Sequence, residues 1–218
     1  MSILFFSDSE TVCAQAQQFS GSGLPVLLTN GESPLATPLQ AKLADLLVID
    51  VQGPRLSRLN FDIVGLALVD LTAEMLLSSG GRRLIDVLGR LASVPENAAH
   101  PEESIQLGFY GPAIAVSGAF LADGVTAGLN LLPRTVVLPD VKAVSDLRAL
   151  LARMSDARLR LLALDRPVSV RYEPAKDKVT VAGKGSALLT AFRQSPGQAQ
   201  PTARLHALTD GMTSGWPE

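Results

Sequence analysis

The 218-residue chain has few of the side chains that build metal centres and covalent cross-links. Cys13 is the single cysteine, which excludes an intrachain disulfide and a cysteine-based metal site. The two histidines, His100 and His206, are far apart, and no clustering of His, Cys or carboxylate residues has the spacing of metal ligands. We therefore expect neither a bound metal nor a cofactor.

The chain also lacks an excess of charge, a high aromatic content and a long apolar run. The net charge is −2, and no aromatic residue interleaves with the basic pairs Arg82-Arg83 and Arg158-Arg160 to stack nucleic-acid bases. No apolar run reaches the length of a membrane span, and the first residues lack the basic start of a signal peptide. We expect a cytoplasmic protein that binds neither nucleic acid nor membrane.

What the chain does have is an alternation of strand-like and helix-like segments. It is 47% hydrophobic and 18% charged, which is typical of a well-packed globular domain. Short apolar runs of strand type are separated by segments of helical periodicity. The strand-type runs are Ile3–Phe6, Pro25–Leu28, Leu46–Val51, Ile63–Val69, Thr135–Leu138 and Leu161–Leu164. This alternation predicts an α/β fold with a mostly parallel sheet and helices on both faces.

Two features near the end of the chain depart from that alternation. Val168–Tyr172 and Val179–Val181 flank a turn-rich segment, which predicts a late β-hairpin. Residues 195–218 are rich in Gln, Pro, Ser and Thr. We expect one α/β domain over residues 1–194 and a peripheral tail over 195–218. Its apolar residues would pack on the body or on a second subunit of a homo-oligomer: Leu205, Leu208 and Trp216.

Four segments together resemble a known family. They are Gly128–Pro133, Thr135–Leu138, Leu164–Val168 and Val181–Ser186, and they span roughly a third of the chain in the family's order. The chain is similar here to the cyanophycinase and dipeptidase E family of serine peptidases (peptidase family S51). The resemblance implies a flavodoxin-like, class I glutamine-amidotransferase-like fold and a serine nucleophile at a tight turn from a strand into a helix.

Polar residues that follow the predicted strands are the candidates for a functional site, because parallel α/β sheets bind ligands outside the carboxyl ends of their strands. These candidates are Ser7–Ser9, Asn30–Glu32, Gln52-Gly53, Asp70, Ser117 and Asp140. Ser117 follows the apolar run Ile114–Val116 and precedes small residues, where the resemblance would place the nucleophile. The alternative is a serine that caps the start of a helix.

A serine nucleophile needs a base, and the residues that the resemblance points to are atypical. Asp140 stands where the family has its histidine, and an aspartate of ordinary pKa is a weak base for a serine hydroxyl. Asp123 is the nearest substitute for the family's acidic residue. His100 and His206 lie in polar segments away from these motifs.

Three functions remain open from these residues. The first is a member of the family that has lost serine-peptidase catalysis and binds a small-molecule or peptide ligand or a partner. The second is an active hydrolase of peptide-like amide bonds that uses Ser117 with an atypical base. The third is a non-catalytic scaffold that forms oligomers through an apolar interface.

Overall fold

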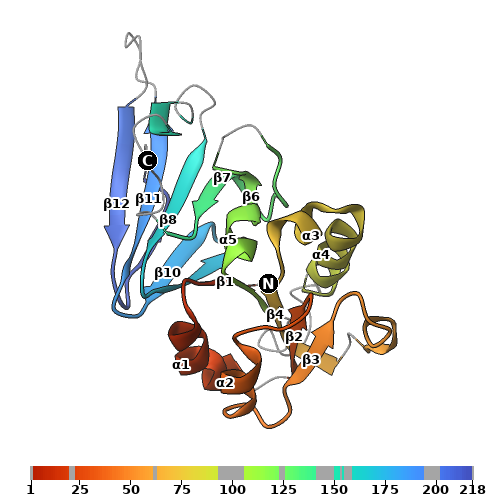
Figure 1. Ribbon diagram of the computed structural model, residues 1–218. Helices are drawn as coiled ribbons and strands as arrows, with labels where there is room; N and C mark the ends of the chain where they lie inside the picture. The colour runs from red at the N-terminus through yellow and green to blue at the C-terminus, as the bar shows by residue number, and fades with distance from the viewer. Residues whose placement is uncertain are drawn as a thin grey trace.

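The larger of two β-sheets has five neighbouring parallel strands that form one side of the sheet and three antiparallel strands that form the other (Figure 1). The computed structural model describes residues 2–19, 23–60, 63–92, 106–122, 126–140, 150–152, 154, 159–193 and 202–217. The strand order in the larger sheet is β13-β10-β9-β1-β5-β4-β2-β3. The parallel strands are β1 (Ser2–Phe6), β2 (Leu24–Thr29), β3 (Leu47–Asp50), β4 (Val64–Asp70) and β5 (Gln106–Tyr110). Antiparallel strands extend the sheet beyond β1: β9 (Ser169–Glu173), β10 (Lys178–Ala182) and β13 (Thr213–Gly215).

The smaller sheet has the order β12-β11-β8-β7-β6. Its strands β6, β7 and β8 are parallel, and β11 and β12 are antiparallel to their neighbours. The bounds are β6 (Gly118–Phe120), β7 (Leu132–Leu138), β8 (Arg160–Asp165), β11 (Ser186–Arg193) and β12 (Thr202–Leu208). The helix predicted after Asp140 falls mostly on residues 141–149, outside the described residues. Leu150 and Met154 are buried against β7 and β8.

Each face of the larger sheet is covered by different elements. On one face, apolar side chains of β1, β2 and β4 pack against the first two helices, α1 (Ser9–Phe19) and α2 (Ala36–Gln40). The opposite face packs against both the smaller sheet and three further helices. These helices are α3 (Ala73–Leu77), α4 (Ser79–Ala92) and α5 (Pro112–Val116). A short 3-10 helix, η1 (Leu56–Arg58), lies in the connection between β3 and β4. These layers bury β1, β2 and β4 almost completely, which explains why the sequences of these strands are continuous apolar runs.

The predicted fold class is confirmed, with one arrangement that the sequence did not predict. The fold is α/β with mostly parallel central strands, and the late hairpin forms between β9 and β10. The runs Thr135–Leu138 and Leu161–Leu164 were correctly predicted as strands. They belong to a separate sheet, because an apolar run specifies a buried strand without specifying its neighbour.

The prediction that Ser117 lies at a turn from a strand into a helix was wrong. Residues Pro112–Val116 form helix α5, and the strand β6 follows Ser117 instead of preceding it. The helix begins here because Gly111 makes the turn and Pro112 takes the first helical position. The backbone N–H that proline lacks would have no hydrogen-bond acceptor within the helix at this position.

Residues of the tail lie at the edges of both sheets. Strand β12 pairs with β11, and β13 pairs with β10. Leu208 is buried, and Trp216 packs against the core between the sheets, whereas Leu205 is exposed. No helix among the described residues has the length and apolar character needed to cross a membrane.

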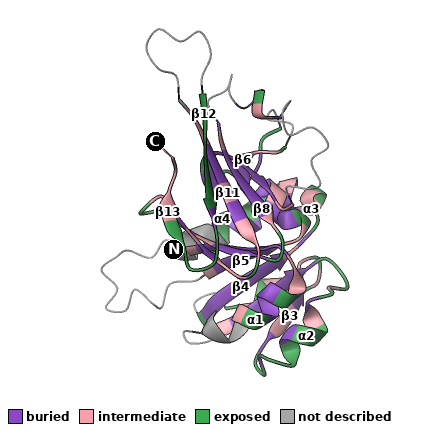
Figure 2. Cartoon of the chain, turned by 90° about the vertical axis from the view of Figure 1, so that its left-hand side faces the viewer, coloured by how far each residue is buried: buried purple, intermediate pink, exposed green. Residues whose placement is uncertain are grey.

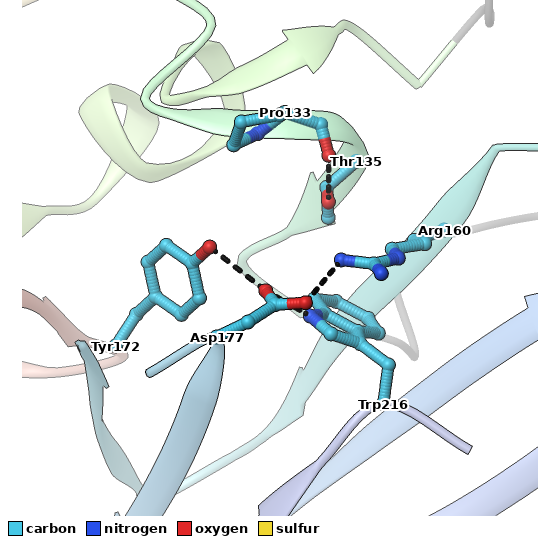
Figure 3. Close-up of polar contacts among 6 residues, drawn as sticks. All are labelled: Pro133, Thr135, Arg160, Tyr172, Asp177 and Trp216. Atoms are coloured by element: carbon cyan, nitrogen blue, oxygen red, sulfur yellow. Dashed lines mark hydrogen bonds and ion pairs between the residues drawn. The ribbon is translucent and has the colours of Figure 1, made fainter. Parts of the chain in front are cut away.

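One polar cluster fixes the tail to both sheets (Figure 3). Asp177, in the turn between β9 and β10, accepts hydrogen bonds at Oδ1 from the Tyr172 hydroxyl and from Nε1 of Trp216, each at 3.0 Å. Its Oδ2 accepts from Nη1 of Arg160, at the start of β8, at 2.8 Å. The Arg160 guanidinium also lies 5.1 Å from the centroid of the Trp216 ring. The cluster therefore joins the hairpin, the smaller sheet and the tail.

Candidate functional site at the carboxyl edge

The carboxyl ends of the parallel strands meet at one edge of the larger sheet, which we call the carboxyl edge. Asp8 follows β1, Asp70 ends β4 and Tyr110 ends β5. All three residues are partly exposed. Because neighbouring parallel strands end at the same edge, their terminal side chains lie close to one another.

Hydrogen bonds hold the two carboxylates in place. Asp70 Oδ2 accepts from the Ser33 hydroxyl at 2.5 Å. Asp8 Oδ1 accepts from the Thr11 amide at 2.9 Å, which caps α1, and its Oδ2 accepts from the Ser7 hydroxyl at 2.8 Å. These bonds position acidic groups at the edge before any ligand binds.

Tyr110 is influenced by charged groups from both sheets. Burial raises the pKa of Tyr110 above its ordinary value, and the charge of Asp70 raises it further. The Arg166 guanidinium lowers this pKa, and the Asp8 carboxylate raises it. The hydroxyl therefore remains protonated near neutral pH and can donate a hydrogen bond.

The smaller sheet supplies the other side of the site. Asp140 follows β7, Arg166 follows β8, and Arg166 Nε lies 3.7 Å from Asp140 Oδ2. The connection after β8 is fastened to the end of β1, since the Ser7 amide donates to the Val168 carbonyl and the Val168 amide donates to the Ser7 hydroxyl. Asp140, which the sequence resemblance aligned with a histidine, thus lies in an ion pair with Arg166.

The tight turn from strand into helix is made by Gly111. Its φ of 59° and ψ of −133° lie in a region that glycine adopts readily and other residues adopt only under strain. A Cβ placed on Gly111 would have no atom within 4 Å, so the position opens onto free space. A tight turn from a strand into a helix is where the resemblance would place a serine nucleophile, and the residue at this turn has no side chain.

Ser117 is in a different environment from the one predicted. It is the C-terminal cap of α5 and is 0% exposed. Its hydroxyl donates to the Ile114 carbonyl at 2.6 Å, one turn earlier in the same helix. A hydroxyl that is buried and engaged in this way has no path to a substrate.

Neither Asp123 nor a histidine is among the described residues of this site. Asp123 and His100 lie outside the described residues. His206 is on the exposed strand β12, where its Nδ1 lies 3.1 Å from the Ser214 hydroxyl. No group of three or more His, Cys, Asp or Glu side chains among the described residues could hold a metal ion.

The sequence predicted Asp8, Asp70 and Asp140 as site residues, but it did not predict Tyr110, Gly111 and Arg166. Tyr110 and Gly111 were not predicted as site residues, although Gly-Pro near the end of an apolar run is a recognisable signal for the end of a strand and the start of a helix. Arg166 carried no such signal. It reaches the site only because the smaller sheet packs beside the larger one.

A depression of about 720 Å³ lies at the opposite, amino edge of the larger sheet. It is lined mainly by the starts of β2 and β4 and by the α2–β3 connection, with Lys42 and Asp45 as its charged residues. Lys42 already donates to the Cys13 carbonyl at 2.9 Å. We assign the candidate site to the carboxyl edge, because charged side chains from several strands converge there.

Comparisons with known proteins identify a fold but no family. No protein-family model matches the chain, and no curated protein matches it. The crystal structure of a peptidase from an acI-B1 Actinobacterium is similar over 99% of this chain and 96% of the peptidase, with 13% sequence identity and a TM-score of 0.62. A likeness at this identity concerns the backbone arrangement, and activity has to be argued from the site. The chain therefore has a peptidase-like α/β fold.

Proposed function

We propose that this protein is a degenerate relative of the cyanophycinase and dipeptidase E family that has lost serine-peptidase catalysis and binds a small ligand bearing an amino group, such as a short peptide, at the carboxyl edge. The observation that carries the loss of catalysis is Gly111. The strand-to-helix turn that would present a nucleophile has no side chain, and a buried Ser117 does not replace it.

The charge of the carboxyl edge supports the class of ligand. The charges of Asp8, Asp70 and Arg166 all act on Tyr110, and Arg166 forms an ion pair with Asp140. The Arg166–Asp140 pair partly neutralises itself, which leaves Asp8 and Asp70 as the excess negative charge. An ammonium group beside these two carboxylates would gain charge-assisted hydrogen bonds, and the Tyr110 hydroxyl could donate to a carbonyl oxygen of the same ligand.

A pair of matched probes tests this proposal. We expect an unprotected dipeptide to produce saturable amide shifts at the carboxyl edge in ¹H–¹⁵N spectra, whereas its N-acetyl derivative binds at least tenfold more weakly. Asp70→Asn should weaken binding of the unprotected dipeptide roughly tenfold, since a hydrogen bond to a charged group contributes about 1.5–3 kcal/mol.

The control for this experiment is Asp45→Asn, which removes the same charge at the amino edge and should leave the affinity unchanged. Equal binding of the two dipeptides would contradict the proposal. So would shifts that cluster at the depression near Asp45 instead of near Asp70 and Gly111.

A further inference from the structure

Strand β12 forms an exposed edge of the smaller sheet. Six of its seven residues are exposed, and Leu208 alone is buried. Within the described part of the chain its paired neighbour is β11, so the outer backbone edge of β12 faces away from the sheet. Figure 2 shows the strand as an exposed arrow beside the buried strands of the same sheet. Such an edge is a ready template for pairing with another strand.

One face of this edge is apolar. The pairing register places Ala203 opposite Phe192, Leu205 opposite Thr190 and Ala207 opposite Leu188. Leu205 is 59% exposed. Phe192 and Leu188 are partly buried against the outer core of the smaller sheet. The apolar face of β12 therefore continues this hydrophobic cluster to the edge of the sheet, where Leu205 is exposed to solvent.

The order of side chains along β12 is nearly the same in both directions. Around Leu205 the chain reads Ala203-Arg204-Leu205-His206-Ala207. If two copies of β12 pair antiparallel about a two-fold axis through Leu205, each leucine lies opposite its own copy and Ala203 lies opposite Ala207. The apolar side chains of both copies then fall on the same face, because direct cross-strand partners share a face of the sheet. A two-fold interface needs this kind of self-complementarity.

We propose that β12 pairs antiparallel with β12 of a second copy of this chain, so that the smaller sheets of the two copies become one continuous sheet. The pairing satisfies outer backbone groups of Ala203–Ala207 and covers Leu205 with Leu205 of the second copy. The proposal is independent of ligand binding at the carboxyl edge. The partner strand at this edge is β12 of a second copy and not an unrelated extended peptide. Pairing with an unrelated peptide would not require the symmetric order of side chains around Leu205.

Sedimentation velocity of the full chain, run over a range of concentrations, tests the proposal. We expect a species of twice the 23.0 kDa chain mass. Leu205→Lys places two ammonium groups opposite each other on the axis and should raise the dissociation constant at least 100-fold. Val87→Lys introduces the same charge at another exposed apolar residue, on α4, and should leave the dimer intact.

Cross-linking tests the pairing register directly. It also tests the proposal independently of whether the lysine variant folds. With a short bis-maleimide, Leu205→Cys should give a covalent dimer and Val87→Cys should not, and the buried Cys13 should remain unmodified. A wild-type chain that is monomeric at all concentrations would overturn the proposal. A dimer that persists in Leu205→Lys, or one that Leu205→Cys fails to cross-link, would also overturn it.

Discussion

Replacing Asp177 with alanine is expected to lower the free energy of unfolding by about 2–3 kcal/mol. The substitution leaves the buried Tyr172 hydroxyl and the Trp216 indole N–H without their shared acceptor. The ion pair with Arg160 adds little, because both side chains are more than a third exposed to solvent. Asp177 also has a φ of 50°, a left-handed conformation that alanine adopts less readily than aspartate.

The control is Asp177→Asn, which keeps one carbonyl acceptor and tolerates the left-handed conformation. It should lose less than half as much stability as the alanine variant. Denaturant unfolding followed by fluorescence measures both effects directly, because Trp216 is the only tryptophan in the chain. Equal stability of the alanine variant and the wild type would show that the cluster does not hold the tail to the sheets.

Raising the pH above 10 is expected to destabilise the protein through Tyr172. Burial, the hydrogen bond to Asp177 and the charge of Asp177 together raise the pKa of Tyr172 from its ordinary value of 10.0 to about 12, against a lowering by Arg160. The folded state therefore favours the protonated phenol. The stabilisation that comes from the raised pKa of Tyr172 is fully present below pH 10. It is lost between pH 10 and 12, because the unfolded chain releases the phenol proton at a lower pH than the folded chain does. In this range the free energy of unfolding should fall by up to about 1.4 kcal/mol per pH unit.

Unfolding measured at pH 9, 10 and 11 separates this effect from the general alkaline loss of stability. Tyr172→Phe should be less stable than the wild type at pH 9 and should show a shallower decline above pH 10. Tyr110→Phe removes the second tyrosine with a raised pKa, so it measures the separate share of that residue in the decline. Parallel decline of the wild type and Tyr172→Phe between pH 10 and 11 would contradict the assignment.

Local patterns along the chain predicted the elements but not their assembly. The apolar run Ile3–Phe6 became β1 and the alternating Val168–Tyr172 became part of β9, because composition and period specify a buried or half-buried strand. The same reasoning could not assign Thr135–Leu138 to a second sheet. Sheet membership depends on contacts with residues far away in sequence, such as the pairing of β7 with β6 and β8.

The candidate site was predictable only where it follows strand ends. Asp8, Asp70 and Asp140 were identified because each comes within two residues of the end of an apolar run. Ser117 was misplaced, since Ile114–Val116 is equally apolar in a helix and in a strand and the preceding Gly111-Pro112 was the deciding signal. Arg166 joins the site through packing between two sheets, which no local pattern encodes.

The assignment of a carboxyl edge without a serine nucleophile is tested most directly by fluorophosphonate labelling of the folded protein, followed by mass spectrometry of its peptides. We predict no adduct on Ser117, and the same labelling pattern in Ser117→Ala as in the wild type. An adduct on Ser117 that disappears in Ser117→Ala would contradict this account.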